Sequence, residues 1–222
     1  MPSPAASSPF DQSRYQVRLD WGVAGLRRLA PADVVVVVDV LRFSSTVSAR
    51  VGAGERVALD REAFAVSRNG AAVADAASAD ASGPLVLLGC LRNARAVAAA
   101  VLAEQQRRGG RTSIAVIAAG ELAGPEGDGE LRFAVEDLLG AGAVVDALSR
   151  LGIDHTAPEA AAACEAYRGL GGAVRHLLTA SGSGQELLAR DRRDEVLAAA
   201  EIDVDGVAPA LHDRVFVAAG PH

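Results

Sequence analysis

The sequence predicts a three-layer α/β/α fold with a mostly parallel, or mixed, central sheet. Residues 34–38 are five consecutive valines, and β-branched apolar side chains on both faces suit a strand buried inside a sheet. Apolar segments of strand length alternate with helical patterns over the first two-thirds of the chain. Half of the 222 residues are apolar, which is enough to bury a sizeable core.

The first part of the chain predicts three strands and two helices. Strands are expected at 16–21, 34–38 and 56–59, and helices at 23–29, before Pro31, and at about 45–53, capped by Ser44 or Ser45. Residues 60–69 allow two interpretations, a helix ended by Asn69 and Gly70 or a short strand at 64–66. A parallel crossover needs about a dozen residues, so the segment is too short for both.

The rest of the chain predicts two further strands and a helical C-terminal third. A helix at 71–77, a loop at 78–83 and a strand at 85–88 precede a helix at 94–107, which Asn93 opens and Gly109 ends. A strand at 113–118 leads to a glycine-rich acidic loop at 123–130 and a helical pattern at 133–151, interrupted by Gly140 and Gly142. Helices follow at 158–167, 173–179, 185–189 and 194–200, with apolar segments at 207–211 and 215–217.

Residues 1–13 are rich in Pro, Ser and Ala and are expected to form a flexible tail before a single domain at 14–220. The tail lacks the pattern of a secretory signal, and no apolar run reaches the roughly 18 residues of a membrane helix. The two cysteines, Cys90 and Cys164, lie in apolar contexts without metal-ligand spacing, so we expect them to be reduced and buried. We therefore expect a cytoplasmic protein with no membrane partner.

The charge pattern argues against nucleic acid. The net charge is −6, there is no lysine, and the arginines are scattered along the chain. The four histidines show no paired ligand spacing and are expected to be ordinary surface or core residues.

Polar residues follow three of the predicted strands at their carboxyl ends, where ligands bind in parallel sheets. They are Asp39 with Arg42, then Asn93, then Glu121. Glu136 and Asp137 start the next helix, and together these carboxylates suit a hard cation such as Mg²⁺. Acidic residues also favour helix starts for dipole reasons alone.

The stretch from Arg42 to Thr46 allows an anion site at a helix start, or simply a turn with Asp39 paired to Arg42. Ser181 to Gly184 similarly suggests an anion site or, more often, a flexible turn.

Three known patterns are absent. Leu41 stands where haloacid-dehalogenase phosphatases require a second Asp, and neither a GxxxxGK phosphate loop nor a dinucleotide-binding glycine motif is present.

Several segments together resemble the 2-phosphosulfolactate phosphatases, often called ComB-like proteins. They are DVLRFSST at 39–46, the pair Asn69-Gly70, GCLRNARAVA at 89–98, AAGE at 118–121 and EDLLGAGA at 136–143. RLDWG at 18–22 and ASG at 180–182 are also similar to family members. The resemblance implies an α/β/α fold and a Mg²⁺-dependent phosphomonoester hydrolase. Its reaction would convert 2-phospho-3-sulfolactate and water to sulfolactate and phosphate, a step in coenzyme M biosynthesis.

The resemblance also implies roles for individual residues. Asp39, Glu121 and Asp137 would hold or orient the metal, and Asp39, Glu121 and Glu136 would be catalytic, with Glu121 or Glu136 as the base. A small anionic phosphoester would be bound by Arg42, Ser45, Thr46, Asn69, Gly70 and Asn93. Attack by a metal-activated water and a covalent aspartyl-phosphate on Asp39 both stay open. The resemblance favours a homodimer.

Two other functions compete with this one. The family carries a longer stretch where residues 60–69 stand here, which suggests a catalytically silent relative that binds a small anion or serves as an assembly subunit. A metal-independent esterase is the least favoured, because no serine lies in a GxSxG strand-to-helix elbow.

Overall fold

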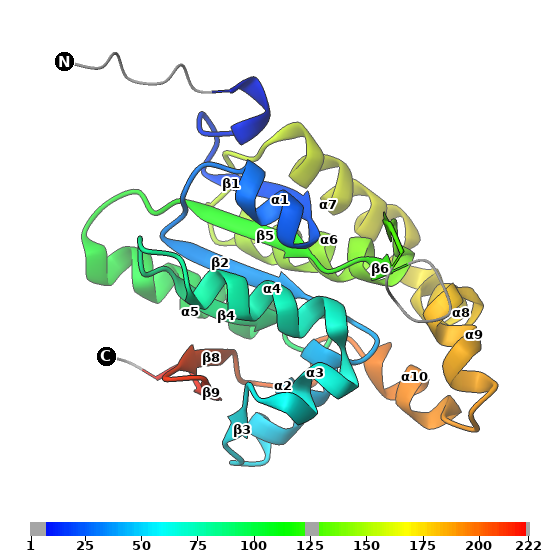
Figure 1. Ribbon diagram of the computed structural model, residues 1–222. Coiled ribbons are helices and arrows are strands. Elements are labelled where there is room, and N and C mark those ends of the chain that lie inside the picture. The colour runs from blue at the N-terminus through cyan, green and yellow to red at the C-terminus, as the bar shows by residue number, and fades with distance from the viewer. Residues whose placement is uncertain (1–7, 123–128, 221–222) are drawn as a thin grey trace.

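The computed structural model describes residues 8–122 and 129–220, and in it helices cover both faces of a central sheet (Figure 1). This is the three-layer α/β/α architecture expected from the sequence. In chain order the elements are η1 (Pro9–Asp11), β1 (Val17–Trp21), α1 (Gly22–Arg28), β2 (Val34–Val38), α2 (Phe43–Gly52), β3 (Val57–Ala58), α3 (Arg61–Val66), α4 (Arg68–Ser78), β4 (Leu85–Gly89), α5 (Ala94–Arg108), β5 (Ile114–Ala118), β6 (Glu121–Leu122), β7 (Leu131–Arg132), α6 (Val135–Arg150), α7 (Pro158–Leu170), η2 (Gly171–Ala173), α8 (Val174–Ala180), α9 (Gly182–Leu188), α10 (Arg193–Ala199), β8 (Pro209–His212) and β9 (Val215–Ala218).

The main sheet has the strand order β1-β5-β2-β4-β8-β9-β3. The first four strands run parallel, and β8, β9 and β3 extend the sheet with antiparallel pairs, so the sheet is mixed. The valine strand β2 lies between β4 and β5, and all five of its residues are buried. Because both neighbours of β2 are parallel strands, its carboxyl end opens onto the same edge as theirs.

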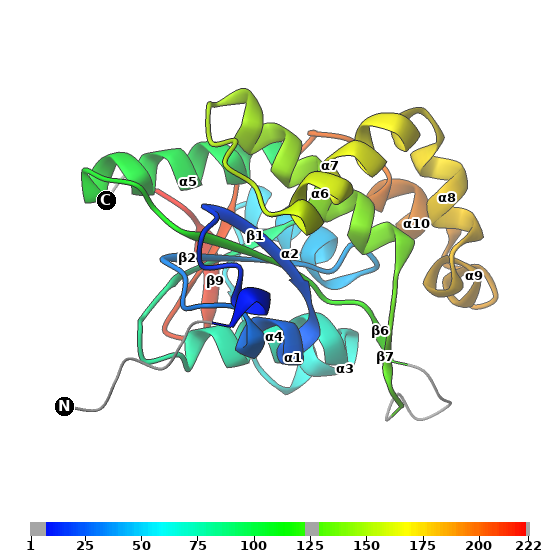
Figure 2. The same cartoon turned by 90° about the horizontal axis from the view of Figure 1, so that it is seen from above.

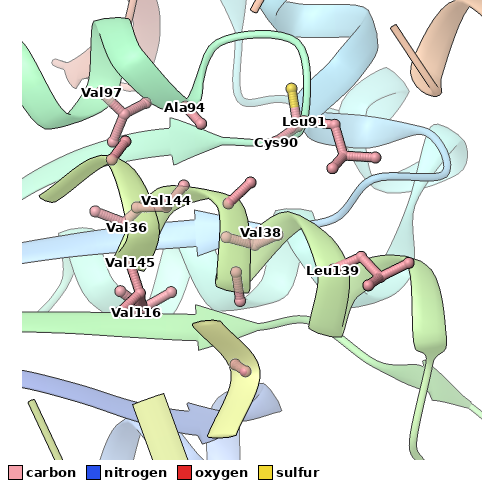
Figure 3. Packing of buried hydrophobic residues seen from close by; sticks show 14 of the residues in the cluster. Val36, Val38, Cys90, Leu91, Ala94, Val97, Val116, Leu139, Val144 and Val145 are labelled. Atoms are coloured by element: carbon pink, nitrogen blue, oxygen red, sulfur yellow. The ribbon is translucent and has the colours of Figure 1, made fainter. Parts of the chain in front are cut away.

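The valines of β2 serve two separate cores because successive side chains of a strand point to opposite faces. Val36 and Val38 pack with Leu139, Val144 and Val145 of α6, as Figure 3 shows. The other face of the sheet packs against α1, α2 and α4 (Figure 2). This double coverage explains why β2 has no polar residue until Asp39.

Residues 60–69 form helix, not strand. Asp60 caps α3 by accepting hydrogen bonds from the backbone N–H groups of Glu62 and Ala63, and Ser67 caps the start of α4. Asn69 and Gly70 therefore lie in the first turn of α4 and do not end the preceding helix. The expectation of a helix in this segment is confirmed, but its end was placed wrongly.

Two expectations about helix starts and interruptions are wrong. Ser44 and Ser45 do not cap α2, because their hydroxyls donate to the carbonyl oxygens of Val37 and Val40. Gly140 and Gly142 do not interrupt α6, which is continuous over 16 residues. A Cβ at Gly140 would lie 2.9 Å from Val38 Cγ1, so the glycine lets α6 approach the sheet closely.

Residues 8–13, the described part of the expected tail, contact β1 through Gln12. Gln12 is buried, its Nε2 donates to the carbonyl oxygen of Leu19, and its Oε1 accepts from the Leu19 N–H. These two bonds attach the segment to β1. Residues 1–7 of the expected tail, and residues 123–128 of the expected acidic loop, lie outside the described residues. Within residues 8–122 and 129–220, no helix is both long and apolar enough to cross a membrane.

Candidate active site

A cavity of about 470 Å³ lies at the carboxyl ends of β2 and β5. Loops after both strands, the starts of α4 and α6, and helix α9 form its wall. Six of the residues nominated from the sequence line it, and five of its lining residues are acidic. The lining residues are Asp39, Leu41, Arg42, Ala65, Val66, Ser67, Arg68, Asn69, Gly120, Glu121, Leu122, Glu136, Asp137, Ser183, Glu186, Leu187 and Arg190.

Asp39 follows the last valine of β2 and is held on both carboxylate oxygens. Its Oδ2 accepts hydrogen bonds from the Ser67 hydroxyl and, at 3.1 Å, from the Gly70 N–H, while Oδ1 accepts from the Phe43 N–H. Burial raises the pKa of Asp39 to about 6; the bonds from Ser67 and Phe43 oppose this rise, and the charge of Glu121 adds to it. The side chain is 5% exposed, so its orientation is fixed by these bonds.

The first turn of α4 fits around Asp39. A Cβ at Gly70 would lie 2.7 Å from the Asp39 Cβ, closer than non-bonded carbon atoms pack, so a side chain at this position would displace the carboxylate. Asn69 Nδ2 donates to the carbonyl oxygen of Gly120 at 2.7 Å. Asn69 and Gly70 thus link α4 to the ends of β5 and β2.

Asp137 lies in the first turn of α6 and binds backbone from both strand ends. Its Oδ1 accepts from the Val40 N–H at 2.8 Å, and its Oδ2 accepts from the Gly120 N–H at 2.9 Å. Burial raises the pKa of Asp137 well above its ordinary value, and the charges of Asp39 and Glu136 raise it further. The carboxylate therefore fixes the relative positions of the two loops.

Glu121 and Glu136 complete the acidic wall. Glu121 is partly buried in β6, and its Oε2 accepts a hydrogen bond from the Ser183 hydroxyl of α9. Burial raises the pKa of Glu121; the bond from Ser183 opposes this, the charges of Glu136 and Glu186 add to it, and Arg132 lowers the pKa. Glu136 is buried beside Asp137 in α6.

The chemistry of this wall fits a hard divalent cation. Among the described residues, no three His, Cys, Asp or Glu side chains form a complete ligand cluster. Mg²⁺, however, usually retains several waters and binds one or two carboxylates together with substrate phosphate oxygens. The charge of Glu121 raises the pKa of Asp39, and a cation bound beside these carboxylates would offset that repulsion.

Four residues nominated as substrate ligands, Ser45, Thr46, Gly70 and Asn93, are not among the residues that line the cavity. Ser45 donates to the Val40 carbonyl oxygen, and Thr46 is exposed. Asn93 is fully buried, where its Oδ1 accepts from the Cys90 N–H and its Nδ2 donates to the Leu88 carbonyl oxygen. Asn93 stabilises the loop after β4. Arg42 does line the cavity and forms an ion pair with Glu195 at 3.4 Å.

Sequence reasoning missed several cavity residues. Ser67 and Ser183 each donate a hydrogen bond to a site carboxylate, and Glu186 and Arg190 line the cavity from the C-terminal helices. For the stretch Ser181 to Gly184 the sequence predicts an anion site or a flexible turn. This stretch instead caps α9 through the Ser181 hydroxyl, which accepts from the Gly184 N–H.

The family model for 2-phosphosulpholactate phosphatase matches residues 53–214 of this chain. The chain belongs to the 2-phosphosulpholactate phosphatase family. The matched region includes Asn69, Gly70, Glu121, Glu136 and Asp137, and it begins after the Asp39 loop that completes the cavity. No curated protein matches the chain. The family is one of phosphatases, which agrees with the expectation drawn from the sequence motifs.

Proposed function

We propose that this protein is a Mg²⁺-dependent phosphatase that hydrolyses a small acidic phosphomonoester of the 2-phosphosulfolactate type. The observation that carries the proposal is the convergence of Asp39, Glu121, Glu136 and Asp137 on one cavity at the carboxyl edge of the sheet. Membership of the phosphatase family supports the reaction class.

The electrostatics of the cavity support the cation. A phosphomonoester is itself negatively charged, so the carboxylates would repel it unless a cation lay between them. Asp39 and Glu121 would hold Mg²⁺, with Asp137 behind them. The bound metal would neutralise phosphoryl charge and lower the pKa of a bound water.

Side chains of the protein would then bind the phosphoryl group and transfer protons. Arg42 lines the cavity and would bind a phosphoryl oxygen, while the bond from Asn69 to the Gly120 carbonyl oxygen would hold the loop after β5 in position. Glu136 lines the cavity and would accept a proton from the water that attacks phosphorus, and the ester oxygen would leave as the alcohol after taking up that proton in turn. Asp39 is nearly enclosed and accepts hydrogen bonds on both oxygens, which favours attack by water over attack by its carboxylate.

Phosphate release from 2-phosphosulfolactate and 2-phospholactate, with Mg²⁺ and with EDTA, tests the proposal. We expect turnover that requires Mg²⁺ and falls at least about 100-fold in Asp39→Asn and in Glu121→Gln. Glu62→Gln is the matched control, because Glu62 is exposed on α3 and does not line the cavity. It should retain wild-type activity.

Folded protein that releases no phosphate from either compound would overturn the phosphatase proposal. Saturable binding of 2-phospholactate by such protein would then support the catalytically silent relative. Equal turnover with Mg²⁺ and with EDTA would instead contradict the role of the metal.

A further inference from the structure

A second, smaller cavity of about 240 Å³ adjoins the first. The two share Glu121, Glu136 and Ser183, so these side chains form the partition between them. The second cavity adds Arg132 of β7 and the backbone that leads into α9. A group bound in the smaller cavity would therefore lie just across Glu121, Glu136 and Ser183 from a group bound in the larger one.

The position of Arg132 follows from the β6–β7 ladder. Arg132 is paired directly with Glu121, so the two side chains leave the same face of the ladder. A Cβ added at Gly182 would lie 3.1 Å from Arg132 Nη1, which places the guanidinium against the start of α9. Arg132 thus lies at the wall of the smaller cavity, opposite the acidic partition.

Arg132 is unusual among the arginines near the site. Within residues 8–122 and 129–220, its guanidinium forms no hydrogen bond or ion pair with another residue. Its cross-strand neighbour Glu121 accepts from Ser183 instead. By contrast, Arg42 pairs with Glu195, and Arg190 pairs with Glu186. The charge of Arg132 lowers the pKa of Glu121, but no group among the described residues accepts a hydrogen bond from its guanidinium, which can therefore donate to an anionic ligand.

We propose that the smaller cavity binds the second acidic group of the substrate, a carboxylate or sulfonate, and that Arg132 determines specificity for it. The inference rests on the proposed function, because the phosphoryl group is assigned to the larger, carboxylate-lined cavity. A planar guanidinium presents paired N–H donors that match such oxygens. The partition would then lie beside the short carbon link that joins the two groups.

Comparison of 2-phospholactate with isopropyl phosphate tests this assignment, because the second compound replaces the carboxylate with a methyl group. We expect the wild-type kcat/KM to favour 2-phospholactate, and Arg132→Gln to reduce that preference about 10- to 100-fold, the usual effect of losing a charged hydrogen bond. The kcat/KM for isopropyl phosphate should stay unchanged, and Arg132→Lys should recover part of the preference. Arg50→Gln, which removes only a surface ion pair with Glu55, should match wild type.

Calorimetric binding of both compounds in the presence of Mg²⁺ separates this inference from the proposed function. Preferential binding of 2-phospholactate that Arg132→Gln abolishes would support the inference even without turnover. An equal loss for both compounds would overturn it and assign Arg132 to the phosphoryl group. Unchanged preference in a folded Arg132→Gln variant would also overturn it.

Discussion

The carboxylate of Asp137 shows how much of the site depends on a single residue. Its two oxygens accept the buried N–H groups of Val40 and Gly120, which follow different strands. The last backbone bond between the two strand ends runs from the Ala119 N–H to the carbonyl oxygen of Val38, and beyond it the side chain of Asp137 connects them. Asp137 was nominated from the sequence as a metal ligand, and the structure gives it this additional bridging role.

We expect Asp137→Ala to lower the free energy of unfolding by about 2–4 kcal/mol, because two buried N–H groups lose their acceptor. Urea denaturation measures the change. Asp146→Ala is the matched control on the same helix, since Asp146 pairs with the exposed Arg150 and Arg168. That substitution leaves no buried N–H group without an acceptor, because both arginines are exposed to water, so it should cost less than Asp137→Ala. Equal destabilisation by the two substitutions would show that the backbone bonds of Asp137 contribute little.

At the scale of elements, the α6–α7 contact sets the position of the helix that carries Glu136 and Asp137. Gly142 of α6 lies directly against the backbone of α7, where a Cβ would be 2.8 Å from both the carbonyl carbon of Ala163 and the Cβ of Tyr167. Glycine costs helix stability by itself, but here its lack of a side chain permits the close packing of the two helices.

Gly142→Ala is expected to destabilise the protein by about 1–3 kcal/mol, because α7 must move away from α6 to admit the methyl group. Thermal and urea unfolding measure the effect. Gly169→Ala in α7 is the control, since a Cβ there meets nothing within 4 Å. Because alanine has a greater helix propensity than glycine, this substitution should leave the stability of the protein unchanged or slightly raised. A neutral Gly142→Ala would mean that the helices can separate without cost.

At the scale of the whole molecule, the acidic cavity makes stability depend on pH. Burial raises the pKa of Asp39 from 3.8 to about 6, and the pKa values of Asp137 and Glu121 are raised as well. The folded protein therefore retains protons that the unfolded chain has lost. Between the pKa of a carboxyl group in the unfolded chain and its raised pKa in the folded protein, the folded state binds more protons than the unfolded state. The free energy of unfolding therefore decreases as pH rises through this range.

In the presence of EDTA, we expect the titration of Asp39 alone to make the free energy of unfolding about 1 kcal/mol smaller near pH 7 than near pH 5. Asp39→Asn should remove this part of the pH dependence, because the amide does not titrate, and Mg²⁺ should counteract it in the wild type. Urea midpoints at both pH values measure the difference. An identical pH dependence in the variant and the wild type would contradict the raised pKa of Asp39.

Much of the fold could be predicted from local patterns. The valine strand, the glycine that ends α5 and the alternation of strands with helices depend on side-chain chemistry and backbone preference within short windows. The errors arose where a distant contact decided the outcome. Ser44 and Ser45 are residue types that commonly cap helices, but their hydroxyls donate instead to carbonyl oxygens of β2 and of the loop that follows it.

The candidate site divides in the same way. The sequence by itself was enough to identify the candidate acids Asp39, Glu121, Glu136 and Asp137. They can be recognised because they are charged residues near the ends of apolar segments that are expected to be buried. Only the tertiary structure decided that Asn93 is enclosed, that Ser67 and Ser183 bind the acids, and that Arg132 lies opposite Glu121. The physical reason is that strand ends are fixed by local sequence, whereas the hydrogen bonds around them join segments far apart in the chain.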